Sequence, residues 1–112
     1  MPALIEKNLA RQAVGVAAET VYTVPGGSTK SIIRDIHLCN NSAADTYVSL
    51  WLVPNAASPT DENVMFYQWI VPANDFVHWT GWQVLDTVGD TIQALSEIAD
   101  QITVTISGAE IT

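Results

Sequence analysis

The stretch YTVPGGSTKSIIRDIHLCNNS, Tyr22 to Ser42, decides the predicted fold of this 112-residue chain. Apolar and polar residues alternate after a Pro-Gly-Gly sequence, which is typical of strands that bury one face. Pro25 fixes its own φ, and Gly26 and Gly27 can adopt positive φ, so the sequence specifies a chain reversal. We expect a strand, a turn and a second strand, which together form a hairpin or a corner.

The second strand of this stretch has an apolar and a polar face. Its apolar face is predicted to carry Ile32, Ile36 and Leu38. Ser31, Asp35 and His37 then point the other way, because successive side chains of a strand alternate. Ile33 and Arg34 interrupt this alternation.

Further short strands are expected at residues 46–54, 64–72, 76–86, 91–96 and 102–112, each bounded by proline or turn residues. Gly81 predicts a bulge or bend within 76–86. Seven or eight short strands, with no convincing helix, predict an all-β antiparallel sandwich of jelly-roll or Greek-key topology.

The first residues do not fit this strand pattern. We predict an extended N-terminal arm at residues 1–11, followed by a single β-sandwich domain at residues 12–112; one or two helical turns are the alternative for the arm. Leu4, Ile5 and Leu9 of the arm are candidate interface residues, since they have no evident position in the sandwich.

Composition restricts the partners. Four Lys and Arg residues against twelve Asp and Glu residues give a formal charge of −8, too few cations for a nucleic-acid surface. No apolar run is long enough for a membrane-spanning helix, and the first residues do not resemble a secretory signal. Cys39 is the only cysteine, so an intrachain disulfide and a thiolate metal cluster are excluded. A reducing compartment, or an assembly that needs no disulfides, is expected.

The sequence offers little catalytic chemistry. Asp35, His37 and Cys39 share one strand face, but neighbours on such a face lie roughly 6 to 7 Å apart, too far for direct hydrogen bonds between short side chains. We interpret this face as structural. His78 lies in no nucleophile motif, and the ligand spacings of zinc and calcium sites are missing. We therefore predict no catalytic residue, no metal site and no cofactor.

Aromatic residues are concentrated on three neighbouring predicted strands: Trp51, Phe66, Tyr67, Trp69, Phe76, Trp79 and Trp82. Large rings in a small sandwich usually fill its core. Trp79 and Trp82 flank the predicted bend at Gly81, where side chains are less easily enclosed. These two are the aromatic candidates for an interface.

Several phrases of the sequence resemble those of a family. They are YTVP with its Gly-Gly turn, IIRDIHLCNNS followed by a Val-Ser-Leu strand, and GDTIQALS leading to ITVTISGAEI. Together they resemble small β-sandwich accessory proteins of tailed-bacteriophage virions, over about Thr20 to Ile111. The resemblance implies a virion protein without catalytic residues, and a decoration role would imply an oligomer, often a trimer, on the outside of the shell.

We therefore expect a non-enzymatic structural protein of a phage particle, namely a capsid decoration (cement) protein that stabilises the shell exterior. Its partners would be the major capsid protein or another virion protein, and copies of itself, after assembly in the host cytoplasm. The alternative is a carbohydrate-binding or receptor-recognition module of a head fibre or tail, with Trp79 and Trp82 as a stacking platform. A small enzyme is the third reading.

Overall fold

The structure, a computed structural model, describes residues 3–28 and 30–112, which form eight β-strands and no helix. The strands are β1 (Leu4–Ala13), β2 (Glu19–Thr23), β3 (Lys30–Asn40), β4 (Thr46–Val53), β5 (Val64–Val71), β6 (Phe76–Leu85), β7 (Thr91–Ser96) and β8 (Ile102–Ile111). Met1 and Pro2 of the predicted arm lie outside the described residues. The prediction of an all-β fold is confirmed.

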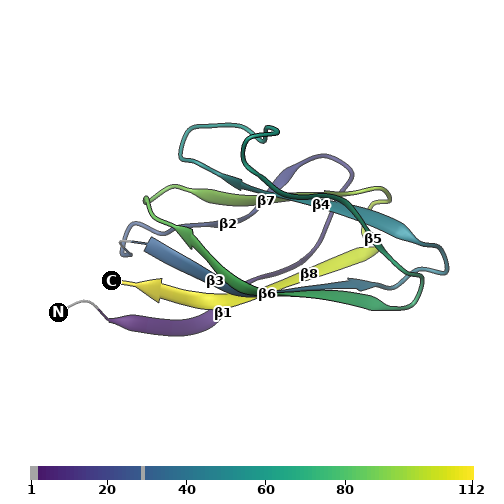
Figure 1. The fold of residues 1–112 in the computed structure, drawn as a ribbon, viewed down its shortest axis with the longest axis horizontal. Coiled ribbons are helices and arrows are strands. Elements are labelled where there is room, and N and C mark those ends of the chain that lie inside the picture. The colour runs from purple at the N-terminus through teal and green to yellow at the C-terminus, as the bar shows by residue number, and fades with distance from the viewer. Residues whose placement is uncertain (1–2, 29) are drawn as a thin grey trace.

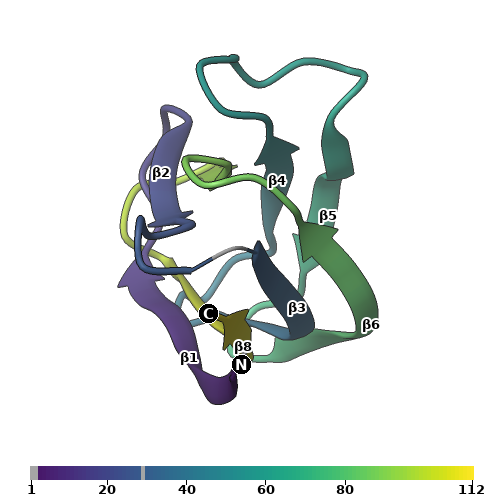
Figure 2. The ribbon, with the colours of Figure 1, turned by 90° about the vertical axis from the view of Figure 1, so that its left-hand side faces the viewer.

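The strands form two antiparallel four-stranded sheets with the orders β1-β8-β3-β6 and β2-β7-β4-β5. Figure 1 shows them as two layers, and the end-on view in Figure 2 places β1 and β2 along one side and β5 and β6 along the other. Each connection from β1 to β4 and from β5 to β8 crosses to the other sheet, and only β4 and β5 are successive strands of one sheet. This order is the jelly-roll arrangement of two interleaved Greek keys.

Side-chain alternation builds the core between the sheets. Val48 and Leu50 of β4 are fully buried and belong to the core cluster, as do Ile102, Val104 and Ile106 of β8. Thr103 and Thr105 of β8 are partly exposed, as expected for a strand with one buried face, whereas Ser49 of β4 is covered as well. The predicted alternation of these two strands is confirmed.

The stretch that decided the predicted fold is a corner, the second of the two expected forms. β2 belongs to one sheet and β3 to the other, so the segment between them carries the chain from layer to layer. Ser28 N donates a hydrogen bond to the carbonyl oxygen of Pro25 (3.0 Å), which closes the turn. The loop is tied to the β6–β7 turn by Val24 N to Asp90 O (2.9 Å).

The prediction of a separate N-terminal arm requires correction. β1 runs across the expected boundary at residue 11 and pairs antiparallel with β8 of the same chain. Its beginning is held by two hydrogen bonds between the backbones of Ala3 and Thr112 (3.2 and 3.0 Å). The segment is an edge strand because β8 pairs with it over its whole length apart from a register shift at Leu9, which the spacing of apolar residues alone did not indicate.

Register shifts interrupt the regular ladders. β3 is shifted at Arg34 relative to both its neighbours, and β6 is irregular at Gly81 and Trp82 opposite that point. The predicted irregularity at Gly81 is confirmed. The shift also reverses the faces of β3, so the prediction for its first residues is wrong: Ser31 points into the sandwich and Ile32 points outward.

Candidate interaction surface

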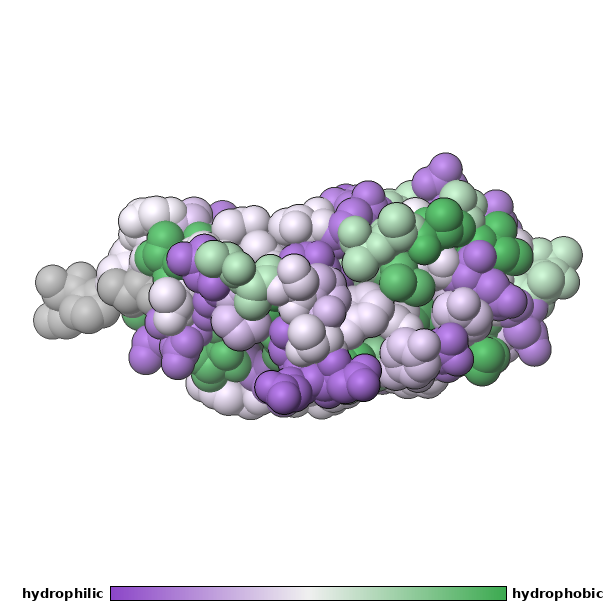
Figure 3. Space-filling view, turned by 90° about the horizontal axis from the view of Figure 1, so that it is seen from above, coloured by the Kyte–Doolittle hydropathy of each residue, from purple (hydrophilic) through white to green (hydrophobic). Residues whose placement is uncertain are grey.

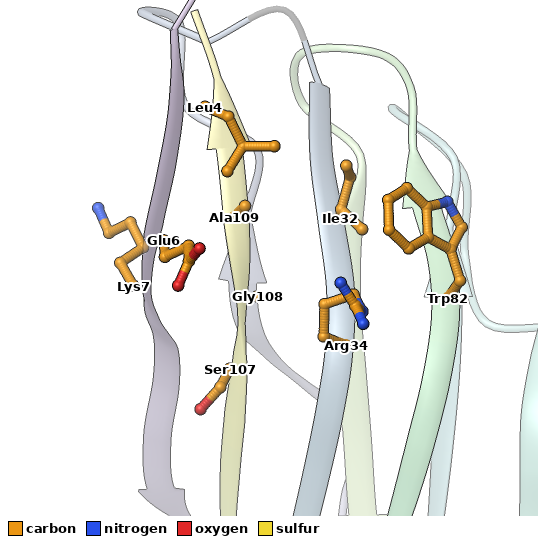
Figure 4. A pocket seen from close by; sticks show the side chains of 9 residues that line it. All are labelled: Leu4, Glu6, Lys7, Ile32, Arg34, Trp82, Ser107, Gly108 and Ala109. Carbon is orange, nitrogen blue, oxygen red and sulfur yellow. The ribbon is translucent and has the colours of Figure 1, made fainter.

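A groove of about 470 Å³ crosses the outer face of the β1-β8-β3-β6 sheet. Figure 4 shows the side chains that line it, one group on each strand. They are Leu4, Glu6 and Lys7 of β1, Ser107, Gly108 and Ala109 of β8, Ile32 and Arg34 of β3, and Trp82 of β6. The groove is open to solvent, and it has an apolar floor and charged walls.

The floor of the groove exists because β8 and β3 approach closely at Gly108. A Cβ atom on Gly108 would lie 1.9 Å from the carbonyl oxygen of Ile32, closer than any real contact. Ile32 and Ala109, opposite each other in the ladder, are almost completely covered yet lie outside the core cluster. Ile32 and Ala109 form the apolar floor of the groove, and Leu4 and Trp82 form its two rims.

One wall of the groove is an ordered cation on an aromatic ring. The Arg34 guanidinium carbon lies 4.9 Å from the ring centre of Trp82, a cation–π contact. Arg34 Nε also donates a hydrogen bond to the carbonyl oxygen of Gly81 (3.2 Å). Arg34 therefore joins the irregular segments of β3 and β6. These two contacts fix the direction of its side chain at the surface.

The structure brings together two of the predicted interface residues and separates the others. Leu4 (57% exposed) and Trp82 (58% exposed) line the same groove, although 78 positions separate them in sequence. Ile5 is exposed beside them on β1. Leu9 instead belongs to the core cluster, and Trp79 packs against that cluster, so neither is available as a surface anchor.

Three of the seven aromatic residues on the neighbouring predicted strands pack against the core, as large rings usually do. Phe66 and Trp69 make an edge-to-face contact at 5.1 Å and, like Trp79, pack against the core cluster. Trp51 is only 7% exposed. Tyr67, Phe76 and Trp82 remain exposed. The two-tryptophan platform is thereby corrected, because the irregularity at Gly81 turns Trp79 inward and Trp82 outward.

A polar cluster that the sequence predictions missed lies between the sheets beside the groove. Tyr22 Oη donates to Glu110 Oε2 (2.5 Å), Ser31 Oγ lies 2.7 Å from Tyr22 Oη, and Lys7 Nζ lies 3.1 Å from Glu110 Oε1. The hydrogen bond from Tyr22 lowers the pKa of Glu110, Lys7 lowers it further, and burial opposes them. Burial, followed by the bond to Glu110, raises the pKa of Tyr22.

The sequence contained a signal for this cluster. Ile102, Val104 and Ile106 face inward, and the same parity continues to Gly108 and Glu110. A carboxylate on the inward face of a strand requires partners, since an unpaired buried charge is costly. The partners Tyr22 and Lys7 lie on other strands and could not be assigned without the strand order.

The histidines lie on the same outer face, beyond the groove. His78 Nε2 is 2.7 Å from Asp35 Oδ2 across the β3–β6 pair, and both side chains are partly exposed. His37, the expected neighbour of Asp35, instead stacks on Phe76 with ring centres 4.9 Å apart. Within residues 3–28 and 30–112, neither histidine is hydrogen-bonded to a serine, threonine or cysteine side chain.

The side chains of residues 3–28 and 30–112 offer no metal site. No set of three or more His, Cys, Asp or Glu side chains is arranged there to hold a metal ion. Cys39 is a partly buried free thiol. No helix of that part of the chain could span a membrane. The most developed surface feature is thus the groove, with its apolar floor and its oriented Arg34.

No protein-family model matches the chain, and no curated protein matches its sequence. Two solved structures share the fold over its whole length. One is a chain of the Bacillus endospore appendages, which form a family of disulfide-linked pili; its TM-score is 0.60 at 10% identity, with 100% of this chain and 90% of that chain covered. The other comes from the acid-stable capsid of the Helicobacter pylori bacteriophage KHP30, with a TM-score of 0.58 at 9% identity and coverages of 100% and 94%. At these identities the likeness shows a common jelly-roll fold.

Proposed function

We propose that this chain is a non-enzymatic structural protein of a phage particle, a capsid decoration (cement) protein that binds the outside of the shell. One observation carries the proposal: the sandwich matches a chain of a phage capsid over 100% of its own length and 94% of that chain. The phrases in the sequence that resemble tailed-phage accessory proteins point the same way.

The surface is consistent with assembly by many modest contacts. The groove is open to solvent, and further apolar residues are exposed on several strands and loops: Ile5, Val16, Tyr67, Ile70, Phe76, Val84, Val88 and Ile98. On a symmetric shell, such patches are repeated, and avidity makes weak contacts strong. A homotrimer, with a mass three times 12.1 kDa, is the oligomer that this role favours.

The test uses particles of the phage that encodes the chain. Deleting the gene should leave infectious shells that release their DNA at a lower temperature, and added purified protein should restore the original release temperature. Mass spectrometry of purified wild-type particles should also find the chain in stoichiometric amounts. Absence of the chain from those particles would contradict the proposal, as would a release temperature that the deletion leaves unchanged.

A carbohydrate-binding or receptor-recognition module is the second candidate. The exposed ring of Trp82 beside Arg34 and Ser107 favours it, since sugars stack on aromatic rings flanked by polar groups. Titration with neutral and acidic oligosaccharides, followed by tryptophan fluorescence, distinguishes the two. The decoration role predicts a flat response; a saturable shift that the Trp82→Phe variant loses would favour the sugar-binding module.

A further inference from the structure

The charges of this acidic chain are distributed very unevenly. All four cationic residues, Lys7, Arg11, Lys30 and Arg34, lie on β1 and β3 of one sheet. The strands of the β2-β7-β4-β5 sheet contain a single charged residue, Glu19. Most acidic residues lie in the loops at the two ends of the sandwich: Asp45, Asp61, Glu62, Asp75, Asp86, Asp90, Glu97 and Asp100.

Three of the four cations face outward and lack an acidic partner. Arg11 is exposed and lies opposite Thr105, which faces away from the buried Val104 and Ile106. Lys30 is exposed and shares the face of Ile32 by strand alternation. Among the described residues, the ion pairs are Lys7 with Glu110 and His78 with Asp35, so Arg11, Lys30 and Arg34 remain available.

Arg34 is oriented for an external carboxylate. Its Nε donates a hydrogen bond to the carbonyl oxygen of Gly81, and its guanidinium group lies over the ring of Trp82. Within the part of the chain that the structure describes, its two Nη groups make no hydrogen bond. A guanidinium that is already ordered loses less entropy on binding, and two Nη groups can grip a carboxylate in bidentate fashion.

The apolar floor lies directly beside this cation. Figure 4 shows Ile32 and Ala109 between Leu4 on one side and the Trp82 ring on the other, with Arg34 next to Ile32. Glu6 lies on the opposite rim, and its carboxylate forms no ion pair with the residues that the structure describes. An apolar side chain can therefore enter between the rims while a neighbouring carboxylate reaches Arg34.

The sheet edges are less suited to docking than this face. Register shifts interrupt β1 at Leu9, β2 at Val21, β5 opposite Ser49 and β6 at Gly81, so every edge strand is irregular. Bulges at sheet edges oppose the addition of a further strand. The outer face of the sheet is therefore the better candidate for docking.

We propose that the outer face of the β1-β8-β3-β6 sheet is the docking face for an acidic, partly apolar surface of a second virion protein. An apolar side chain of that protein occupies the groove, and a carboxylate binds Arg34, with Arg11 and Lys30 adding longer-range attraction. Charge complementarity selects an acidic partner, because Arg11, Lys30 and Arg34 form no ion pair among the described residues. The inference rests on the proposed function.

The experiment measures binding of the purified full-length chain to phage particles made without it. Arg34→Met keeps an apolar stem against Trp82 and removes the charge; we expect binding about tenfold weaker and a smaller dependence on NaCl concentration. Trp82→Ala removes a rim of the groove, and we expect a loss of about 30-fold or more. Both side chains are exposed, so folding should be retained, as checked by circular dichroism.

Two matched controls lie on the other sheet. Thr20→Glu changes the net charge by the same amount as Arg34→Met, at an exposed residue of β2. Tyr67→Ala removes an exposed aromatic side chain of β5. Both variants should bind particles within about twofold of the wild-type chain, since surface changes outside a contact have little effect.

The outcomes separate the docking face from the proposed function. Weaker binding of the two groove variants alone supports the docking face. Wild-type binding that both groove variants retain overturns the docking face and leaves the decoration role intact. A wild-type chain that does not bind particles overturns both. If the groove variants lower the solution mass of the free protein without weakening particle binding, the face joins copies of this chain, and the proposal is wrong.

Discussion

The two outer faces of the sandwich are built differently, one from strands of 10 or 11 residues and the other from strands of 5 to 8 residues. The β1-β8-β3-β6 sheet presents a groove, three cations that form no ion pair within residues 3–28 and 30–112, and an exposed tryptophan, Trp82. The β2-β7-β4-β5 sheet has strands almost without charge, and its outward-facing Trp51 is buried. Figure 3, a view onto that second sheet, shows residues of intermediate hydropathy over its middle and hydrophobic ones gathered toward one end.

This difference indicates which face has apolar and charged groups left for binding a partner. A covered tryptophan already contributes its apolar area to the stability of the chain, whereas an exposed one can contribute it to a complex. We call the first face the groove face and the second the plain face. If this distinction is right, equivalent substitutions on the two faces should have different consequences.

The largest effect is expected beneath the groove face. Gly108→Ala places a methyl group against the carbonyl oxygen of Ile32, at a distance of 1.9 Å, so β8 and β3 must separate. We expect destabilisation by at least about 5 kcal/mol, measured by urea denaturation or seen as insoluble expression. Gly26→Ala is the control, because its added Cβ would contact nothing within 4 Å, and its cost should stay below about 0.5 kcal/mol. Equal stability of both variants would refute the close approach.

The two tryptophans provide the next test of the comparison. Trp51→Ala on the plain face removes a buried ring and should cost about 3–4 kcal/mol of unfolding free energy. Trp82→Ala on the groove face removes a ring that is 58% exposed and should cost less than about 1 kcal/mol. Thermal denaturation of both variants beside the wild type measures the difference. Similar losses would mean that Trp82 is as much a part of the folded core as Trp51.

A smaller effect depends on pH and concerns the polar cluster beside the groove. The pKa of Glu110 is lowered in the folded chain, so its contribution to stability is present above the ordinary glutamate pKa of about 4.3 and is lost as the pH falls through the folded value. Glu110→Gln should cost about 1–2 kcal/mol at pH 7 and progressively less below pH ~4.3. Urea denaturation at several pH values measures the difference in unfolding free energy between the variant and the wild type. A difference that does not change with pH would exclude a contribution from the lowered pKa of Glu110.

Regular strands could be predicted from the sequence, whereas their irregularities could not. Val48, Leu50, Ile102 and Val104 face the core as their alternation predicts, because a period of two dictates the faces of an undistorted strand. The proline-bounded ends of β4 and β5 were predicted for the same local reasons.

Failures of prediction occur where the period is broken or the partner is distant. The extra residue at Arg34 exchanged the faces of Ser31 and Ile32, and a single sequence cannot tell such a bulge from an imperfect pattern. β1 was not predicted as an edge strand because its ladder depends on β8, about a hundred residues away. The groove could not be predicted, since it requires the order of all four strands.

Zero-length carbodiimide cross-linking of intact particles tests the docking face most directly. This reagent joins lysine amines to carboxylates in contact, and the only two lysines of the chain, Lys7 and Lys30, lie on the strands of the groove face. Since Lys7 is paired with Glu110, Lys30 is the informative residue. We predict cross-links from Lys30 to Asp or Glu side chains of a second virion protein. Particles that contain the chain but link it to other proteins only through the carboxylates of its end loops would contradict the account.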